Sequence, residues 1–372
     1  MTAINIRRTV DLNGAARLIQ TMGSELTFCL LSEPGVGKTS VLKLLASMEG
    51  DEWRNVGDYN ADDKFEYCYI DAPNKRDGDL FMPMPNRETN SLDQFTTAII
   101  NMNDPRPKMI LIDEAFKVPK NMRPLYTRLY LERCLGDKKL PKGSRVIITS
   151  NNPEDGVSDF FAGHEADRVV FINVRKFPAE VWANGWATEN GISAITRTCV
   201  MMNPRVMASY MDGVETKDNP IIFHPQTNPT RYASPRSIAA ADAPVRNRTV
   251  LGEELTWAAV EGATNAAYAQ LLMSFIALEK ELVDPRKPLE DPLNTPLPNN
   301  PAAMVLLMNN MIDLIKTPTE LSNVMKYIVR SNSREVQSVF VSIATDNKRV
   351  AKLASMNADV QEWMKKNYRI AR

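Results

Sequence analysis

The sequence predicts an α/β fold in which a parallel sheet flanked by helices is followed by helical regions. Between residues 25 and 175, short apolar runs alternate with helical segments, as in a parallel sheet that is covered on both faces. After Phe177 the strand pattern fades and helical patterns replace it. A glycine-containing loop at 32–39 lies between an apolar run and a helix, at the carboxyl end of a predicted strand. Ligands of parallel sheets bind at such strand ends, so a binding site is expected there.

The predicted elements divide the chain into five regions. These are an N-terminal helix (1–24), an α/β core (25–177), a helical lid (178–284), a proline-rich connector (285–301) and a C-terminal helical region (302–372). Strands are predicted at 26–31, 65–70, 109–112, 145–149 and 169–172. Helices are predicted at 11–23, 178–190, 192–202, 235–241, 253–283, 302–317, 319–331, 333–345 and 348–369. The prolines of the connector predict neither a helix nor a central strand in it.

Length, composition and charge are those of a soluble protein with more than one domain. The chain has 372 residues, of which 44% are hydrophobic and 24% charged, and its 45 basic residues equal its 45 acidic residues. This balance argues against a constitutive polyanion binder, although it is compatible with a local basic stripe. No signal-peptide pattern is seen, and the longest apolar stretch, 266–278, is too short to span a bilayer, so we expect a cytoplasmic protein without a membrane partner. Four widely spaced cysteines indicate free thiols, with neither a zinc site nor a disulfide framework: Cys29, Cys68, Cys134 and Cys199.

Residues 32–39, Ser-Glu-Pro-Gly-Val-Gly-Lys-Thr, nearly match a phosphate-binding P-loop. Two glycines allow backbone N–H groups to approach a β-phosphate closely, and the following helix adds the positive end of its dipole. Lys38 is expected to reach the β- and γ-phosphates, and Thr39 to offer its hydroxyl to Mg²⁺. The motif starts with glycine, whereas this chain has Ser32, so we expect nucleotide binding to survive in a weakened form if that position requires a positive φ. The predicted nucleotide-binding residues are Ser32, Glu33, Pro34, Gly35, Val36, Gly37, Lys38, Thr39, Ser40 and Asp113.

An apolar strand at 109–112 ends in two carboxylates, Asp113 and Glu114. In a P-loop protein, Asp113 would hold Mg²⁺ together with Thr39, and Glu114 would polarise the attacking water. A buried strand that ends in two acids by chance is the alternative. The P-loop upstream favours the catalytic interpretation.

The strand at 145–149 runs into Ser150, Asn151 and Asn152. A polar amide at this strand end lies beside the acidic strand end, within reach of a γ-phosphate or of the attacking water. Asn152-Pro153 is also an ordinary turn signal, and without the other motifs that interpretation is preferred.

Together these motifs resemble those of an AAA+ ATPase, and most closely those of the MoxR branch. The P-loop and the Asp113-Glu114 pair occur in the family's order and spacing with further motifs at 152–156, 166–168 and 233–237. The segments 131–136 and 139–143 strengthen the placement in the MoxR branch. The resemblance covers roughly residues 25–300.

The resemblance implies roles for three further residues. Asn152 matches the sensor 1 position, and Arg168 matches an arginine finger that reaches the nucleotide of the neighbouring subunit. Arg236, in the lid, matches sensor 2. The alternatives are a surface salt bridge of Arg168 with Asp167 or Glu165, and an ordinary solvated arginine at position 236.

Two segments are candidates for substrate contact, at 75–85 and at 134–142. In the MoxR branch these positions carry a pore-facing insert and a hairpin before sensor 1. Packed methionines and a solvated lysine turn are equally good interpretations. The basic tail at 346–372 could contact nucleic acid or an acidic partner, but a solvated helix face is the simpler interpretation. His164 and His224 receive no chemical role.

The combined prediction is a MoxR-like ATP hydrolase that binds ATP and Mg²⁺ at sites between subunits. A ring is expected because an arginine finger acts on a neighbour, and the expected number of subunits is six. It would remodel or assemble a protein partner; the resemblance suggests a von Willebrand factor A-domain protein. Its expected catalytic residues are Glu114, Asn152, Arg168 and Arg236. A nucleic-acid-directed motor, such as a helicase loader or DNA remodeller, and an ATP-binding scaffold with little turnover are the alternatives.

Overall fold

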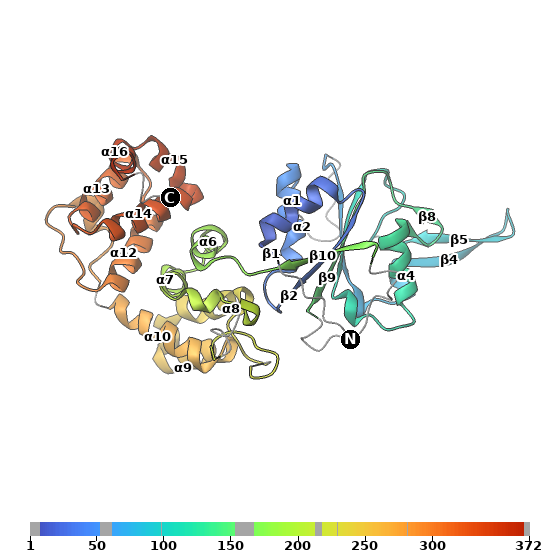
Figure 1. Cartoon of the computed structure of the whole chain (residues 1–372), viewed down its shortest axis with the longest axis horizontal. Coiled ribbons are helices and arrows are strands. Elements are labelled where there is room, and N and C mark those ends of the chain that lie inside the picture. The colour runs from blue at the N-terminus through green and yellow to red at the C-terminus, as the bar shows by residue number, and fades with distance from the viewer. Residues whose placement is uncertain are drawn as a thin grey trace. The chain divides into compact units, whose positions relative to one another are not determined.

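The computed structural model describes residues 8–52, 62–97, 99–152, 167–212, 218–228, 230–280 and 282–367. The chain divides into two compact units, Met1–Lys176 and Phe177–Arg372. The first is an α/β unit, and the second is built from helices (Figure 1).

The α/β unit contains a six-stranded sheet in which all paired strands are parallel. The strand order is β1-β10-β2-β9-β6-β3. The strands are Thr9–Val10 (β1), Thr27–Ser32 (β2), Glu66–Asp71 (β3), Lys108–Asp113 (β6), Arg145–Asn151 (β9) and Val169–Val174 (β10). The sequence predicted five of them. It missed β1, because two residues are too few to show a periodic pattern.

The central strands β2, β6 and β9 are buried on both faces, apart from the two ends of β9, as the continuous apolar runs predicted. In β2 every residue is buried, and Cys29 and Leu31 pack into a hydrophobic cluster that includes Tyr126 and Leu129. Figure 1 shows α1 and α2 on one side of the sheet and α4 on the other. The helices of this unit are Leu12–Met22 (α1), Val41–Glu49 (α2), Asp77–Leu80 (α3) and Arg123–Thr127 (α4), with short turns at Lys38–Ser40, Ala72–Asn74, Ala115–Lys117 and Arg128–Glu132.

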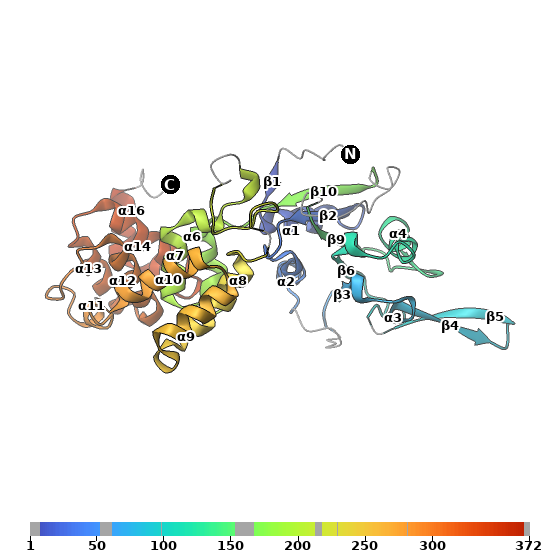
Figure 2. The ribbon, with the colours of Figure 1, turned by 90° about the horizontal axis from the view of Figure 1, so that it is seen from below.

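Two antiparallel hairpins extend from the α/β unit. Phe81–Asn86 (β4) pairs with Ser91–Thr96 (β5), and Figure 2 shows this hairpin projecting away from the sheet. Cys134–Leu135 (β7) pairs with Lys138–Lys139 (β8). The resemblance to the MoxR branch implied the second hairpin, and the first was missed.

The helical unit contains two hydrophobic clusters, one around α7 to α10 and one around α12 to α16. Its helices are Ala179–Trp182 (α6), Ala194–Met202 (α7), Pro235–Arg246 (α8), Arg248–Ala263 (α9), Ala266–Glu279 (α10), Lys287–Glu290 (α11), Pro301–Leu314 (α12), Pro318–Val329 (α13), Arg334–Asp346 (α14), Lys348–Met356 (α15) and Ala358–Lys366 (α16), with shorter turns at Ala183–Ala187, Pro204–Met207 and Tyr210–Asp212.

Three predictions for this unit were wrong in detail. The helix expected at 253–283 is interrupted at Asn265, which caps the start of α10 by accepting from Tyr268 N. The helix expected at 348–369 is interrupted in the same way at Asn357. The proline-rich connector contains α11, because Pro288 lies in its first turn, where a missing N–H costs nothing.

All four cysteines are free thiols, as predicted, and all four are buried. Burial raises the pKa of the Cys29, Cys68 and Cys199 thiols well above the ordinary value. No helix in the described part of the chain has both the length and the hydropathy needed to cross a membrane.

Candidate nucleotide site

The loop after β2 has the backbone that a phosphate-binding loop requires. Gly35 and Gly37 have φ values of 79° and 99°, which residues with a side chain rarely adopt. Lys38–Ser40 forms a short 3₁₀ turn that continues into α2, so the loop opens directly onto a helix N-terminus. These are the two glycines at which the sequence predicted unusual dihedrals.

Ser32 does not take part in the turn, and the concern about its positive φ is therefore not supported. It is the last residue of β2, it pairs with Asn151 of β9, and its backbone is not among those with positive φ. An extended strand accepts serine as readily as glycine and costs less chain entropy.

The Lys38 side chain folds back onto the two strand ends. Its ammonium donates to Ser32 Oγ at 2.8 Å and to Asn151 Oδ1 at 3.0 Å. The main-chain oxygens of Ser32 and Glu33 lie at 3.3 and 3.4 Å. Lys38 is only 8% exposed, so its charge is held in a polar cage at the carboxyl edge of the sheet.

Asp113 is a second residue on which hydrogen bonds converge at the carboxyl ends of the strands. Its Oδ2 accepts from Thr39 Oγ1 and from the Tyr69 hydroxyl, each at 3.0 Å. Its Oδ1 accepts from the Thr149 hydroxyl and from Glu114 N. The Thr39 hydroxyl and the Asp113 carboxylate are hard oxygen donors of the kind that Mg²⁺ prefers, and they are already adjacent, so the pair fits a magnesium ion.

The sequence missed two partners of Asp113. Tyr69 lies on β3 and Thr149 on β9, the strands on either side of β6. Burial and the Asp113 carboxylate raise the pKa of Tyr69 well above its ordinary value, so this hydroxyl keeps its proton and donates a hydrogen bond to the carboxylate. Asp71 is opposite Asp113 in the register of β3 and β6, which places Tyr69 near Asp113, and local sequence does not reveal this register.

Glu114 has an unusual backbone. Its φ of 52° lies in the left-handed region, which is uncommon for a residue with a side chain. Its carboxylate accepts from Lys117 Nζ at 2.8 Å, and its side chain is 41% exposed. Strain of this kind occurs at functional sites, where the surroundings hold the residue in place.

Asn151 and Asn152 divide the amide prediction between them. Asn152, the predicted sensor, is buried directly after β9. Asn151 Oδ1 accepts a hydrogen bond from Lys38 Nζ. The role of Asn152 stays a prediction, and the rest of its motif, at 153–156, lies outside the described residues.

Arg168 lies at the amino-terminal end of the parallel strands, whereas the P-loop lies at their carboxyl-terminal end. It is exposed and directly precedes β10, which runs parallel to β2 with Val169 opposite Thr27. A strand of this length spans about 20 Å at ~3.3 Å per residue. Arg168 therefore lies too far from Lys38 to serve the same P-loop, and a role at a nucleotide requires a second subunit.

Arg236 belongs to the helical unit. It is exposed in the first turn of α8, which starts with a capping box formed by Ser234 and Ser237. Its predicted contact with the nucleotide stays a prediction. His164, to which the sequence assigned no chemical role, and Ala166, the start of the Arg168 motif, lie outside the described residues.

The second predicted substrate segment, 134–142, contacts β5, the strand that pairs with β4 at the end of the first segment, 75–85. Asp137 N, in the turn of the β7–β8 hairpin, donates to Gln94 Oε1 of β5 at 3.1 Å. The neighbouring Gly136 has a φ of 61°, and a Cβ there would lie 1.6 Å from Gln94 Oε1. The β4–β5 hairpin exposes four large apolar side chains: Met82, Met84, Leu92 and Phe95.

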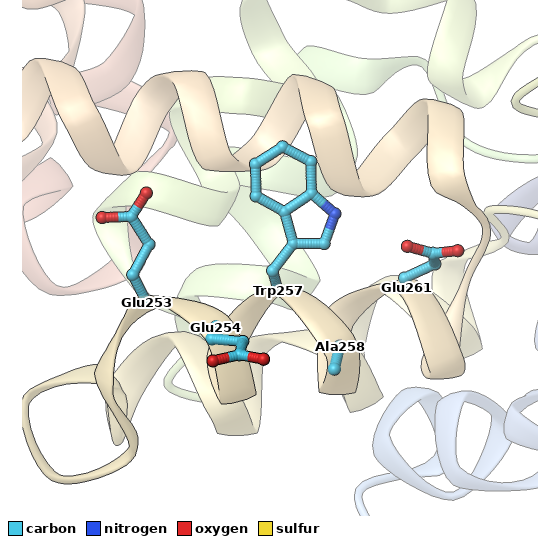
Figure 3. A pocket seen from close by; sticks show the side chains of 5 residues that line it. All are labelled: Glu253, Glu254, Trp257, Ala258 and Glu261. Carbon is cyan, nitrogen blue, oxygen red and sulfur yellow. The ribbon is translucent and has the colours of Figure 1, made fainter.

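A hollow in the helical unit lies along α9. It has a volume of about 490 Å³ and is lined by Glu253, Glu254, Trp257, Ala258 and Glu261. Figure 3 shows the Trp257 ring directed toward an adjacent helix, with acidic side chains on both sides. Within the described ranges no group of His, Cys, Asp and Glu side chains could hold a metal ion by itself, and nothing in this hollow indicates a ligand.

Comparison with known proteins gives likeness only to solved structures. No family model matches the sequence, and no curated protein matches it. The RuvB Holliday junction branch migration motor of Thermotoga maritima is 14% identical, with 86% of this chain and 85% of that chain covered and a TM-score of 0.37. Cdc6p from Pyrobaculum aerophilum is 11% identical, with coverage of 95% and 93% and a TM-score of 0.40. NtrX from Brucella abortus in complex with ADP is 12% identical, with coverage of 96% and 69% and a TM-score of 0.37. At these values the likeness assigns no family to the chain.

Proposed function

We propose that this protein is an ATP hydrolase of the AAA+ type, most similar to the MoxR branch. The observation that carries the proposal is the convergence of Lys38, Thr39 and Asp113 at one edge of the sheet, next to a loop with two left-handed glycines. A cation, a hydroxyl and a carboxylate in this arrangement suit a nucleoside triphosphate and its magnesium ion.

ATP binding would change the partners of Lys38. Its ammonium donates to neutral oxygens, among them Ser32 Oγ and Asn151 Oδ1. Phosphate oxygens bind an ammonium more strongly than neutral oxygens, so the side chain would turn toward the β- and γ-phosphates. Asn151 would then be released at the strand end, close to the γ-phosphate.

Thr39 and Asp113 would hold Mg²⁺, which supplies positive charge to the phosphate oxygens during transfer. Tyr69 and Thr149 fix the Asp113 carboxylate from both sides, so little reorganisation is needed when the site fills. Such preorganisation is the largest contribution that a protein makes to phosphoryl transfer.

Glu114 would orient the attacking water. It must first exchange Lys117 for that water, and an exposed pair of this kind is worth only about 0.2–1 kcal/mol. The exchange is therefore inexpensive. Arg168 would act on the nucleotide of a neighbouring subunit, which implies a ring, for which six subunits is our working number.

We propose a protein as the client. The exposed apolar side chains of the β4–β5 hairpin favour contact with a polypeptide, and the resemblance to MoxR proteins suggests a von Willebrand factor A-domain partner. Lys139, exposed in the β7–β8 hairpin, keeps a nucleic-acid-directed motor as the second candidate. Single-stranded DNA that stimulates turnover with a steep salt dependence would favour that candidate.

The test is turnover by the purified protein. Wild type should release phosphate from ATP. Glu114→Gln should bind ATP without hydrolysing it, because glutamine retains the size of glutamate but cannot accept a proton. Absence of turnover in wild type under all nucleotide and magnesium conditions would leave the scaffold alternative. Glu114→Gln loaded with ATP should also retain the client in a pull-down.

A further inference from the structure

The second residue of the P-loop takes part in a buried ion pair. Lys176 Nζ lies 3.0 Å from Glu33 Oε2, and the two side chains are 1% and 3% exposed. Lys176 is the last residue of the α/β unit and follows β10, which is the neighbour of β2 on the side away from β9. The P-loop is therefore attached on both sides: through Lys38 to β9, and through Glu33 to the segment after β10.

Burying this pair costs free energy, because both charges lose their contact with water. Two apolar side chains would pack there without desolvating any charge, and stability alone does not favour the ion pair. Among the described residues no donor is aligned to give Glu33 Oε2 a hydrogen bond, so its attraction to Lys176 is Coulombic. A second cation, the Lys38 ammonium, lies 3.4 Å from the Glu33 main-chain oxygen.

The pair has two effects on a phosphate loop. Gly35 and Gly37 give the loop many accessible conformations, and an anchor at Glu33 reduces their number. An unpaired carboxylate in the loop would also repel the phosphates of a nucleotide, and Lys176 neutralises it. Both effects increase the fraction of molecules that are ready to bind.

We propose that Lys176 is a positioning residue of the nucleotide site, acting through Glu33 to hold the P-loop in its binding conformation. The inference rests on the proposed ATP-binding function. Lys176 acts on affinity, because the observed dissociation constant rises in inverse proportion to the fraction of binding-competent molecules. Once ATP is bound, the phosphates themselves hold the loop, and the chemical step changes little.

The experiment uses the full-length protein and a fluorescent ATP analogue. Lys176→Met should raise the Kd for the analogue and the KM for ATP about tenfold, as expected if one molecule in about ten keeps a competent loop, with kcat changed less than about threefold. Lys176→Arg keeps the charge and should restore both within about threefold.

Lys108→Met is the matched control. Lys108 is fully buried and pairs with Glu66. It is the first residue of β6, so it lies at the end of the strands opposite the P-loop. Lys108→Met should lower the unfolding temperature, as Lys176→Met does. Its Kd for the analogue should stay within about threefold of wild type, because Lys108 is not part of the nucleotide site. An equal rise in Kd for both variants, at the same folded fraction, would overturn the inference.

The double variant Glu33→Gln/Lys176→Met covers the case in which Lys176→Met does not fold. It removes both charges, so no unpaired carboxylate is left in the interior, but it also removes the anchor. Its Kd should be raised; wild-type affinity in this variant would contradict the proposal. If wild type itself binds no ATP, the proposed function fails, which is a different result from unchanged affinity in the variants.

Discussion

The ammonium of Lys38 donates to Asn151 Oδ1 at 3.0 Å, and this contact joins the P-loop to the end of the neighbouring strand. The register of β2 and β9 produces it, because Ser32 pairs with Asn151. A polar amide at this point is close to where the terminal phosphate of a nucleotide would lie.

Replacing Asn151 should therefore impair turnover more than replacing Asn152. A hydrogen bond to a charged group is worth about 1.5–3 kcal/mol, so Asn151→Ala should lower kcat/KM about tenfold or more. Asn152→Ala is the control one residue along the chain. Steady-state phosphate release compares them, and a larger loss in Asn152→Ala would return the sensor role to that residue.

Much of this site was predictable from local sequence, because the P-loop and the Asp113-Glu114 pair are continuous motifs. The contacts of Asn151 and Tyr69 were not, since they depend on strand register and on pairing between distant segments. The β4–β5 hairpin was missed because Pro83 and Pro85 argue against a central strand. In a two-stranded hairpin every strand is an edge, so the prolines are tolerated.

Ser32→Gly should retain ATP binding within about threefold, because the extended backbone at this position does not require glycine and phosphates replace the serine hydroxyl as a partner of Lys38. It should also lower stability by about 0.5–1 kcal/mol, the cost of glycine inside a strand. Ser32→Ala, which removes only the hydroxyl, is the control. Nucleotide titration and urea unfolding give the two quantities, and a gain of tenfold or more in affinity for the glycine variant would show that serine does weaken the site.

Arg168→Ala should keep ATP affinity and lose turnover by about 10³–10⁵, the range of arginine-finger effects. Mixing it with Glu114→Gln subunits should restore part of the activity. At an interface where the Arg168→Ala subunit supplies Glu114 and its Glu114→Gln neighbour supplies Arg168, both groups are present. Normal turnover by Arg168→Ala alone would disprove action on a neighbour.

The buried thiols should react slowly in the native protein. Because burial raises the pKa of Cys29, Cys68 and Cys199, their reactive thiolate forms are scarce at pH 8, and the side chains are also inaccessible. Ellman's reagent should detect four thiols in urea and almost none within minutes in buffer. Fast native reaction of several thiols at pH 8 would mean that the core opens readily.

Gly136→Ala should separate the two hairpins without removing nucleotide binding. The new Cβ would occupy the position of Gln94 Oε1, and the φ of 61° disfavours any side chain, so the contact between Gln94 and Asp137 N must break. The Gln94→Ala/Gly136→Ala double variant removes the clash and keeps the backbone strain, so it should recover only part of the lost stability.

Gly78→Ala is the control, since its Cβ would meet no atom within 4 Å. Limited proteolysis should cut the β4–β5 hairpin faster in Gly136→Ala than in the control, while Kd for ATP stays within about threefold, because the nucleotide edge is built by other residues. Equal cleavage rates would show that the hairpin is held by contacts other than Gln94.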